Sequence, residues 1–353
     1  MFMNSRRFIA PIAALAALAA SAQNTWTEGG VVYAEDLSDP SKLTVVVVAK
    51  KTPMVAEGES GYEGDISIPS TVEHDLDTYE VVGIAPRAFV GCDGLETLVI
   101  ADGPTKIKEG TIIAPTLESL TLPSSVKSLK QVILEGITEL NLGNGLHKVE
   151  MLFYGPNLER LSFPDATKIL KYVDRKTFTP ENRDKPSKLK ELKFGSNLEV
   201  IDYSFETYFG KSLTIPGSCK TIECSFYEVP ELTTLNIEEG VEKIINCFTN
   251  ISSLETLTLP ASCTETQISL VKSDRLKEIN ILAPSANNIY FNFRKCPELK
   301  SVRMGSPIPP KHNFLSELPY EQVITLYIPK GSIGDYIENW RLNRKPGVMI
   351  EEY

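Results

Sequence analysis

A six-residue phrase, Leu-x-x-Leu-x-Leu, returns along this chain and constrains its fold more than any other feature. The first four copies occupy residues 95–100, 117–122, 137–142 and 158–163. Later copies begin at residues 189, 210, 232, 254, 276, 299 and 323, so successive starts differ by 22, 20, 21, 31, 21, 22, 22, 22, 23 and 24 residues. A period of this length is typical of chains that wind into stacked coils, in which each coil buries its apolar side against its neighbours.

The phrase and its period together predict a leucine-rich-repeat solenoid, a β-rich, right-handed array with one short strand per coil. We expect about 11 to 12 coils between residues 63 and 329. The interval of 31 residues places a long insertion near residues 171–188, which are rich in charged side chains. Such an insertion is either a solvated loop or a binding element, and the sequence leaves both interpretations open.

The two ends of the chain depart from the repeat. Residues 1–22 join two arginines to an apolar stretch and a small-residue cleavage site, which indicates a secretory signal peptide and an exported protein. Residues 23–62 contain two strand patterns separated by a turn, and they predict an N-terminal β-hairpin cap. Residues 330–353 predict a C-terminal cap with a short helix, whose Tyr336, Ile337 and Trp340 would cover the last coil. No later segment is apolar for long enough to predict membrane insertion.

Each repeat also has an apolar second half, in which a phenylalanine often precedes the next strand. Stacked coils would align these rings as a row in the core. The row consists of Phe89, Phe153, Phe205, Phe226, Phe248 and Phe293. We interpret it as packing, because a coil buries its apolar side only against neighbouring coils.

Several motifs are similar to those of a known family. Residues 68–72 read Ile-Pro-Ser-Thr-Val, residues 88–95 contain Ala-Phe-x-x-Cys-x-x-Leu, and residues 327–332 read Tyr-Ile-Pro-Lys-Gly-Ser. Through these motifs and the repeat, the chain resembles the BspA-like leucine-rich-repeat proteins, which are exported by Bacteroides-type bacteria and some other microbes. The resemblance implies surface display and adhesion or protein binding, without catalytic residues. Several middle coils lack the Ala-Phe pair, which affects the coil count and not the fold.

Composition and motifs argue against several classes of function. The formal net charge of −10 disfavours nucleic acid as a partner, because phosphate binding needs clustered Lys and Arg. The histidines, His74, His147 and His312, lie too far apart in a linear array to form a zinc site. Residues 124–127 match the pattern Ser-x-x-Lys, but they fall on the turn that follows a repeat strand. We therefore expect a protein that is not an enzyme and has no metal or cofactor.

The six cysteines can be judged by their places in the repeat. Cys219 and Cys263 take positions where other coils have core aliphatic residues, so we expect buried thiols. Cys224 and Cys247 each follow an Ile-x pair in adjacent coils, where equivalent Cα atoms lie about 5 Å apart. These two residues form either a disulfide or two stacked free thiols.

Alternate residues of each repeat strand point away from the core. We predict that they form a binding face, because solenoids usually bind on such a surface. Most are small and polar, which suits hydrogen bonds to a protein or peptide. The candidate residues are Thr97, Ser119, Thr121, Glu139, Asn141, Arg160, Ser162, Glu191, Lys193, Thr234, Asn236, Thr256, Thr258, Glu278 and Asn280. A solvated sheet face rich in strand-forming Thr is an equally simple interpretation of any single position.

Protein is therefore the expected partner, either an extracellular protein of a host or a component of the producer's own envelope. Glycan or nutrient capture is the alternative, and it would need exposed aromatic rings. Residues 203–209 and 290–293 are the stretches that could supply such rings, although core packing is the simpler interpretation of both. A hydrolase is the weakest hypothesis, because the sequence shows no catalytic constellation.

Overall fold

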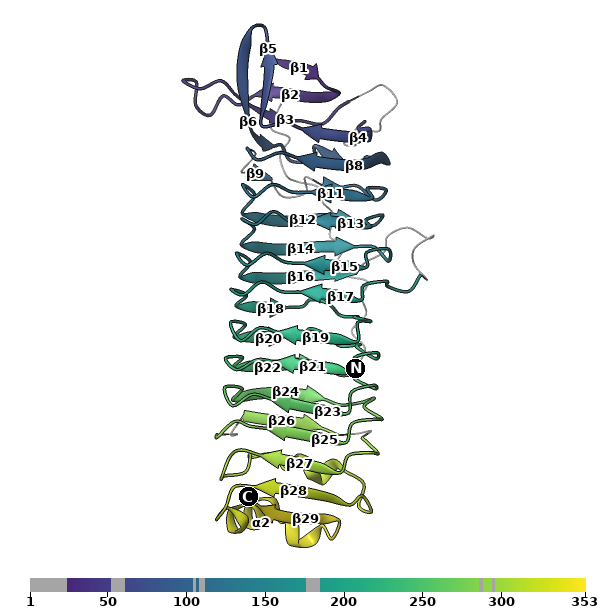
Figure 1. Ribbon diagram of the computed structural model, residues 1–353, viewed down its shortest axis with the longest axis vertical. Coiled ribbons are helices and arrows are strands. Elements are labelled where there is room, and N and C mark those ends of the chain that lie inside the picture. Colours follow the sequence, from purple (N-terminus) through teal and green to yellow (C-terminus); the bar gives the residue numbers. More distant parts are fainter. Residues whose placement is uncertain are drawn as a thin grey trace, which may run out of the picture.

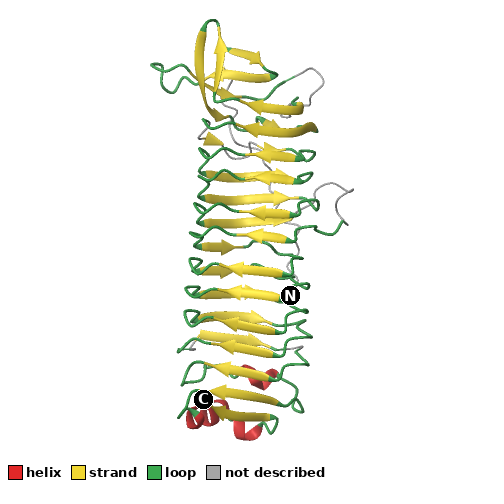
Figure 2. Cartoon of the chain, viewed as in Figure 1, coloured by secondary structure: helices red, strands yellow, loops and turns green. Residues whose placement is uncertain are grey.

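The computed structural model describes residues 24–51, 61–103, 106–107, 112–175, 185–285, 288–293 and 296–353. These residues wind into a long column of coils stacked along one axis (Figure 1). Strands dominate, and the helices of the described residues all lie near the C-terminal end (Figure 2). The expected signal peptide, residues 1–22, and residues 176–184 of the expected insertion lie outside the described residues. The predicted repeat solenoid is confirmed.

The repeat phrase forms one strand per coil, and we call the side of the column made by these strands the repeat-strand face. Neighbouring strands pair in parallel, so that Leu98, Leu120 and Leu140 stand in one line and are buried. The strands are β4 (Glu63–Ile68), β8 (Gly94–Ile100), β11 (Ser119–Thr121), β13 (Glu139–Asn141), β15 (Arg160–Ser162), β17 (Glu191–Lys193), β19 (Ser212–Ile215), β21 (Thr234–Ile237), β23 (Thr256–Leu259), β25 (Glu278–Ile281), β27 (Ser301–Met304), β28 (Ile324–Ile328) and β29 (Val348–Glu352).

The second half of each repeat forms another parallel sheet, which we call the lateral sheet. It is continuous over ten strands. They are β7 (Phe89–Val90), β10 (Ile112–Ile113), β12 (Ser128–Leu134), β14 (Lys148–Tyr154), β16 (Ile169–Arg175), β18 (Val200–Asp202), β20 (Thr221–Glu223), β22 (Lys243–Cys247), β24 (Glu265–Ser269) and β26 (Asn288–Asn292). The inward side chains of both sheets belong to one apolar core that runs the length of the column.

A six-stranded sheet closes the N-terminal end and is larger than the expected hairpin. β1 (Thr25–Glu28) and β2 (Val31–Glu35) form an antiparallel hairpin, and β3 (Thr44–Val47) pairs with β2. The sheet continues beyond residue 62 through β6 (Asp77–Ile84), which pairs with β5 (Thr71–His74) and β9 (Lys106–Ile107). Because β3 pairs in parallel with β6, the coil geometry already begins within the residues that the sequence assigned to the cap.

Most of the predicted phenylalanine row lies in the core. Phe205, Phe226 and Phe248 are fully buried and stack on one another in successive coils, with ring centroids 5.3 and 5.6 Å apart. Phe89 and Phe293 are buried nearer the two ends. Offset stacking of this kind adds to the free energy of simple burial.

Phe153 is buried, as predicted, but it does not belong to this row. It lies in β14, where Leu152 and Tyr154 on either side of it belong to the apolar core. Because successive side chains of a strand point to opposite faces, Phe153 points away from that core. It pairs instead with Ile133 and Asp174 of the adjacent coils.

The predicted helix closes the C-terminal end as α2 (Ile333–Trp340), which follows η1 (Phe314–Glu317) and precedes η2 (Leu342–Arg344). Tyr336 and Trp340 of α2 are buried, as the sequence predicted. The Tyr336 hydroxyl donates to the Ser306 carbonyl at 2.8 Å, and the Trp340 indole donates to the Pro310 carbonyl at 2.7 Å. The sequence pattern did not predict β29, which extends the repeat-strand face by one more parallel strand.

Candidate functional site

The structure places the candidate binding residues in two columns on the repeat-strand face. In the first column, ladder pairing joins Thr97 to Ser119 and Ser119 to Glu139, Arg160 to Glu191, Ser212 to Thr234, and Thr256 to Glu278. In the second column, it joins Thr121 to Asn141, Ser162 to Lys193, Thr214 to Asn236, and Thr258 to Asn280. The predicted register is therefore correct within each ladder, whereas the binding role of these residues stays a prediction.

Neighbouring side chains of the columns hydrogen-bond to one another. The Asn141 amide donates to Thr121 Oγ1 at 3.3 Å and to Glu139 Oε1 at 2.9 Å. The Asn280 amide donates to Thr258 Oγ1 at 3.4 Å in the same way. Cross-strand pairs of this kind support a sheet and also leave polar groups at its surface. The face therefore presents an ordered polar surface.

Charged residues concentrate near the middle of this face. Glu191 Oε2 lies 3.2 Å from Arg160 Nε, and its other oxygen lies 2.6 Å from Lys193 Nζ. The hydrogen bond and charge of Lys193, followed by the charge of Arg160, lower the pKa of Glu191. All three groups are solvated, so their mutual attraction is screened by salt and adds little to stability. They are available to pair with charges on a ligand.

The repeat-strand face is not one continuous sheet. Its ladder divides into β4-β8-β11-β13, β15-β17, β19-β21 and β23-β25-β27-β28-β29, while the lateral sheet runs unbroken from β7 to β26. The central division falls between β17 and β19. At this place β16, β18 and β20 of the lateral sheet still pair from coil to coil, whereas β17 and β19 form no backbone ladder.

Tyr208 fills the space where β17 and β19 fail to pair. Its hydroxyl lies 3.0 Å from the Lys190 carbonyl and 2.9 Å from the Ser212 carbonyl, so it bridges the two strands. Burial raises the pKa of Tyr208, and the nearby Glu191 adds to the effect. A side-chain hydroxyl thus replaces a backbone ladder bond, and Gly210 next to it leaves room for the ring.

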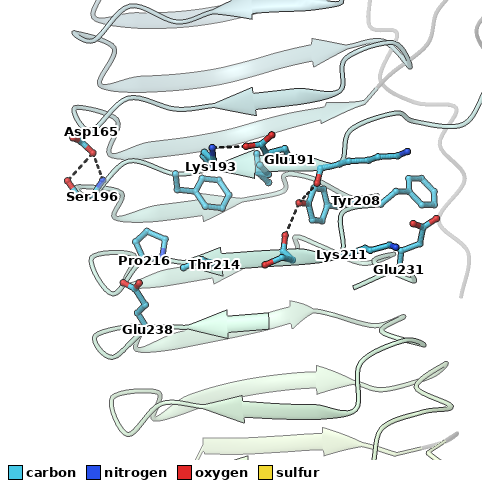
Figure 3. A pocket seen from close by; sticks show the side chains of 15 residues that line it. Asp165, Glu191, Lys193, Ser196, Tyr208, Lys211, Thr214, Pro216, Glu231 and Glu238 are labelled. Atoms are coloured by element: carbon cyan, nitrogen blue, oxygen red, sulfur yellow. Dashed lines mark hydrogen bonds and ion pairs between the residues drawn. The ribbon is translucent and has the colours of Figure 1, made fainter. Parts of the chain in front are cut away.

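A groove of about 820 Å³ opens at this division (Figure 3). Figure 3 shows Tyr208 between the two strands, with Glu191 and Lys193 on one coil and Thr214 and Glu238 on the next two. The groove is lined by Asp165, Lys190, Glu191, Leu192, Lys193, Phe194, Ser196, Tyr208, Phe209, Lys211, Ser212, Thr214, Pro216, Glu231 and Glu238. Candidate residues Glu191 and Lys193 therefore line the groove, whereas the other candidate residues lie on the face above and below it.

The rim of the groove is charged and its inner wall is partly aromatic. Asp165 accepts from the Ser196 backbone N–H at 2.9 Å and from its hydroxyl at 3.1 Å, and these hydrogen bonds lower the pKa of Asp165. Phe194 is half-buried and stacks on Phe163, with centroids 6.1 Å apart. The groove therefore has an aromatic inner wall and a rim with charges of both signs. It suits a protein partner whose contact surface has an apolar side chain surrounded by polar ones.

The histidines do not meet. His74 stacks on Trp26 in the N-terminal cap with centroids 4.1 Å apart, and His312 lies against Tyr290 near the C-terminal end. His147 lies between them in the column, one residue before β14. The described part of the chain contains no group of three or more His, Cys, Asp or Glu side chains that could hold a metal ion.

The proposed pairing of Cys224 with Cys247 rests on a register that is wrong by one residue. Ile222 pairs with Ile244 and Glu223 with Ile245, so Cys224 stands opposite Asn246, whose amide lies 4.0 Å from the Cys224 sulfur. Cys224 has a φ of 48° and is partly exposed, whereas Cys247 is buried. Both are free thiols, so the structure favours two free thiols over a disulfide.

The remaining cysteine predictions are correct. Cys219 and Cys263 are buried free thiols at core positions. Burial raises the pKa of Cys219 to about 12 and that of Cys263 to about 11. At these values the reactive thiolate is scarce near neutral pH, so both residues behave as small core side chains.

The lateral sheet carries an aromatic pair that the sequence did not single out. Tyr172 and Tyr203 stack in adjacent coils with centroids 5.5 Å apart, and about half of each side chain is exposed. Both have positive φ values, 52° and 46°, a conformation that L residues seldom adopt. Beside them, Lys171 Nζ lies 3.3 Å from Asp202 Oδ2. Exposed rings next to charged groups are a second candidate surface.

Both aromatic stretches named from the sequence divide between core and surface. Phe205 and Tyr208 are fully buried, whereas Tyr203 is exposed and Phe209 half-buried. In the second stretch Phe291 and Phe293 are buried, and Tyr290 is half-buried against His312. The residues that flank the insertion also meet, because the Arg175 guanidinium donates to the Lys185 carbonyl.

The sequence analysis did not predict the groove. The one residue in the sequence that marks its place is Gly210, which stands where most copies of the phrase begin with Leu. A Cβ atom at this position would lie 2.0 Å from Tyr208 Oη, so the missing leucine marks the place where a tyrosine enters between coils.

Comparison with known proteins identifies the repeat. The family described as the BspA type leucine rich repeat region matches residues 66–183 and 184–300, with 6 copies. None of the curated proteins compared with the chain matches it.

Solved structures share the architecture at low sequence identity. A leucine-rich repeat protein from Bacteroides ovatus is 20% identical with a TM-score of 0.58, over 85% of this chain and 76% of that one. The pneumococcal vaccine antigen PcpA is 15% identical over 94% of this chain and 99% of that one, with a TM-score of 0.38. A leucine rich cell surface protein from Faecalibacterium prausnitzii is 15% identical over 80% and 95%, with a TM-score of 0.25. The first of these likenesses supports the fold.

Proposed function

Because the chain belongs to the BspA-type leucine-rich repeat family, we propose that it is a non-catalytic binding protein that holds a protein ligand on its repeat-strand face. The ligand would be centred on the groove between β17 and β19. The observation that carries this proposal is the coincidence of the groove with the division of the ladder. The groove thus lies among the charged residues at the middle of this face.

A protein ligand suits the chemistry of this surface better than the alternatives. Specific interfaces combine a buried aromatic or apolar centre with a polar rim. Phe194 and Phe209 would supply the centre, and the charges of Lys190, Glu191 and Lys211 would supply the rim. Charges of both signs favour a partner with a matching pattern over a uniformly charged polymer such as nucleic acid.

The site of action that we propose is outside the cytoplasm, at the cell surface or in the envelope. Residues 1–22 support export through their signal-peptide pattern. Among the described residues, none of the helices is long and apolar enough to cross a membrane. Adhesion to a host protein and attachment to the producer's own envelope are the two forms that this role would take.

The test is a pull-down with the purified protein against host extracellular proteins and against envelope extracts, read by mass spectrometry. A variant with Arg160→Glu, Glu191→Lys and Lys211→Glu should lose the captured protein, because it reverses charges on and beside the groove rim. A control variant with Lys171→Glu and Asp202→Lys inverts an ion pair on the lateral sheet and should keep it. If the groove variant and the control variant captured the same amount of the partner protein, the binding site would not be the groove.

A second candidate function is glycan capture, and the stacked pair Tyr172 and Tyr203 is the observation that favours it. Exposed aromatic rings beside hydrogen-bonding groups are suited to sugar rings, and Lys171 with Asp202 supplies such groups. A glycan array would show binding that a Tyr172→Ala/Tyr203→Ala variant loses and the groove variant keeps. An array without saturable binding would remove this candidate.

A further inference from the structure

The outermost point of the N-terminal cap is the turn between β5 and β6, which projects beyond the sheet (Figure 1). His74 pairs with Asp77, so the turn consists of Asp75 and Leu76 alone. Their φ values are 48° and 73°, the two positive angles of a turn type in which glycine is normally preferred at the second position. Leu76 is fully exposed at this tip. The packing of the cap does not account for a leucine at this position, where its backbone conformation is costly.

The hairpin around this leucine is rigid and acidic. His74 stacks on Trp26 with an interplanar angle of 6°, which fixes the strand that leads into the turn. Glu73, Asp75 and Asp77 surround the turn, and all three are exposed. The tip is therefore an apolar knob flanked by three acidic side chains, and one of them, Asp75, has its Oδ2 atom 3.4 Å from His74 Nε2.

The opposite end of the molecule carries a pocket of complementary character. It has a volume of about 260 Å³ and lies between η1 and η2. Leu318 and Trp340 form its buried apolar part. Tyr320 and three cations complete the wall, together with Asn313 and Ser316. The cations are Arg341, Arg344 and Lys345, and none of the described residues that line the pocket is acidic.

The three cations are held differently. Lys345 donates to the Leu315 carbonyl and, at 3.0 Å, to the Leu318 carbonyl, so it ties the two short helical segments together. Arg341 and Arg344 are exposed and remain able to meet negative groups. The pocket is thus an apolar hollow with positive charge at its mouth.

From this match we propose that copies of the chain associate head to tail, with Leu76 of one copy in the Trp340 pocket of the next. The acidic residues around the knob would face Arg341 and Arg344 around the hollow, and this charge complementarity selects a second copy as the occupant. The hairpin of β5 and β6 and the helix α2, whose Trp340 lines the pocket, lie at opposite ends of the column (Figure 1). The contact therefore leaves one free knob and one free pocket, and the assembly grows without closing.

Such an assembly goes beyond the proposed function and leaves its surface free. The strands β17 and β19, which border the groove, lie near the middle of the column, away from both ends (Figure 1). Each added copy would therefore add one groove to a row of identical sites. Linked sites raise the avidity for a repetitive or surface-bound partner without any new contact.

The test is sedimentation of the purified protein over a wide concentration range, compared with a Leu76→Gly variant. Wild type should form species larger than one chain as concentration rises, and 0.5 M salt should weaken them because the paired charges are solvated. Leu76→Gly should weaken association roughly tenfold or more, since an anchoring side chain is lost. The same variant should unfold at an equal or higher temperature, because glycine relieves the positive φ.

Two further variants separate docking from a merely structural effect. Leu37→Ala removes another exposed leucine of the N-terminal cap and should leave association unchanged. Asp77→Arg and Arg344→Glu should each weaken association alone, whereas an equimolar mixture of the two variants should recover it. A wild type that remains a single chain at every concentration would overturn the proposal, and so would undiminished association of Leu76→Gly. Neither result would bear on ligand binding at the groove.

Discussion

The two sheets of this solenoid are built from the same coils and behave differently. The lateral sheet runs unbroken through ten strands, from β7 to β26, whereas the repeat-strand face divides into four groups. The continuous sheet is backed by the stacked rings of Phe205, Phe226 and Phe248. At the central division of the other sheet, a tyrosine hydroxyl bridges two strands that do not pair.

This difference shows how a repeat protein can vary one side without losing its fold. Each coil is held to its neighbours by two ladders and a core, so one ladder can open while the other keeps the register. Phe194, Glu191 and Lys193 line the groove at this opening. The binding site that we propose would therefore arise from a local irregularity of the repeat array.

The largest effect is expected from the core behind the lateral sheet. Phe226→Ala should cost about 3–5 kcal/mol of unfolding free energy, because the ring is fully buried between two others and leaves a cavity. Guanidinium unfolding measures this loss. Tyr203→Ala, in the preceding coil but half exposed, should cost far less. Similar losses in the two variants would mean that the stacked row does not stabilise this part of the column.

The next effect tests the division itself. Gly210→Ala should cost about 1–3 kcal/mol, because the new Cβ would lie 2.0 Å from Tyr208 Oη and 2.6 Å from the Lys190 carbonyl. Gly334→Ala is the matched control, since its Cβ meets nothing within 4 Å. Thermal unfolding of the two variants gives the comparison. If Gly210→Ala were neutral, Tyr208 would not occupy the space between the coils as described.

A smaller loss is expected from removing the bridge. Tyr208→Phe keeps the ring and takes away the hydroxyl near the Lys190 and Ser212 carbonyls, at an expected cost of about 1 kcal/mol. Tyr172→Phe removes a hydroxyl from an exposed ring of the lateral sheet and should change stability by less than about 0.5 kcal/mol. Equal effects would indicate that the bridge contributes nothing to holding β17 and β19.

The smallest perturbation probes the lateral sheet without a mutation. Brief treatment of the native protein with a thiol reagent at pH 8 should modify Cys224 first, because it is the partly exposed cysteine. Cys247 should stay unmodified, since burial raises its pKa far above the usual range. Peptide mass spectrometry identifies the modified residue. Protection of both residues, with a mass lower by two hydrogen atoms, would instead reveal the disulfide.

The sequence predicted the solenoid and the two columns of the repeat-strand face because both follow from a period that many coils repeat. It failed where one coil differs from the rest. Adjacent Ile244 and Ile245 made the alignment of Cys247 ambiguous, and the pairing of Ile222 with Ile244 resolved it. Phe153 was misplaced because strand alternation, rather than distance from the next repeat, decides which side chain faces the core.

The groove could not be predicted because it depends on where Tyr208 goes in three dimensions. The pattern marked Gly210 as an irregular start, but a missing leucine alone does not say what replaces it. The Tyr172 and Tyr203 pair was equally hidden, since 31 residues of chain separate two rings that the ladder of β16 and β18 brings together. Irregular coils are thus where structure adds most to a repeat sequence.

The most direct test of the central claim is amide hydrogen exchange of the protein with and without the partner captured in the pull-down. Binding at the groove predicts slower exchange in β17, β19 and residues 208–211, with no change in the lateral strands β18 and β20. Protection confined to the lateral strands would contradict the claim and move the binding site to the Tyr172 and Tyr203 surface.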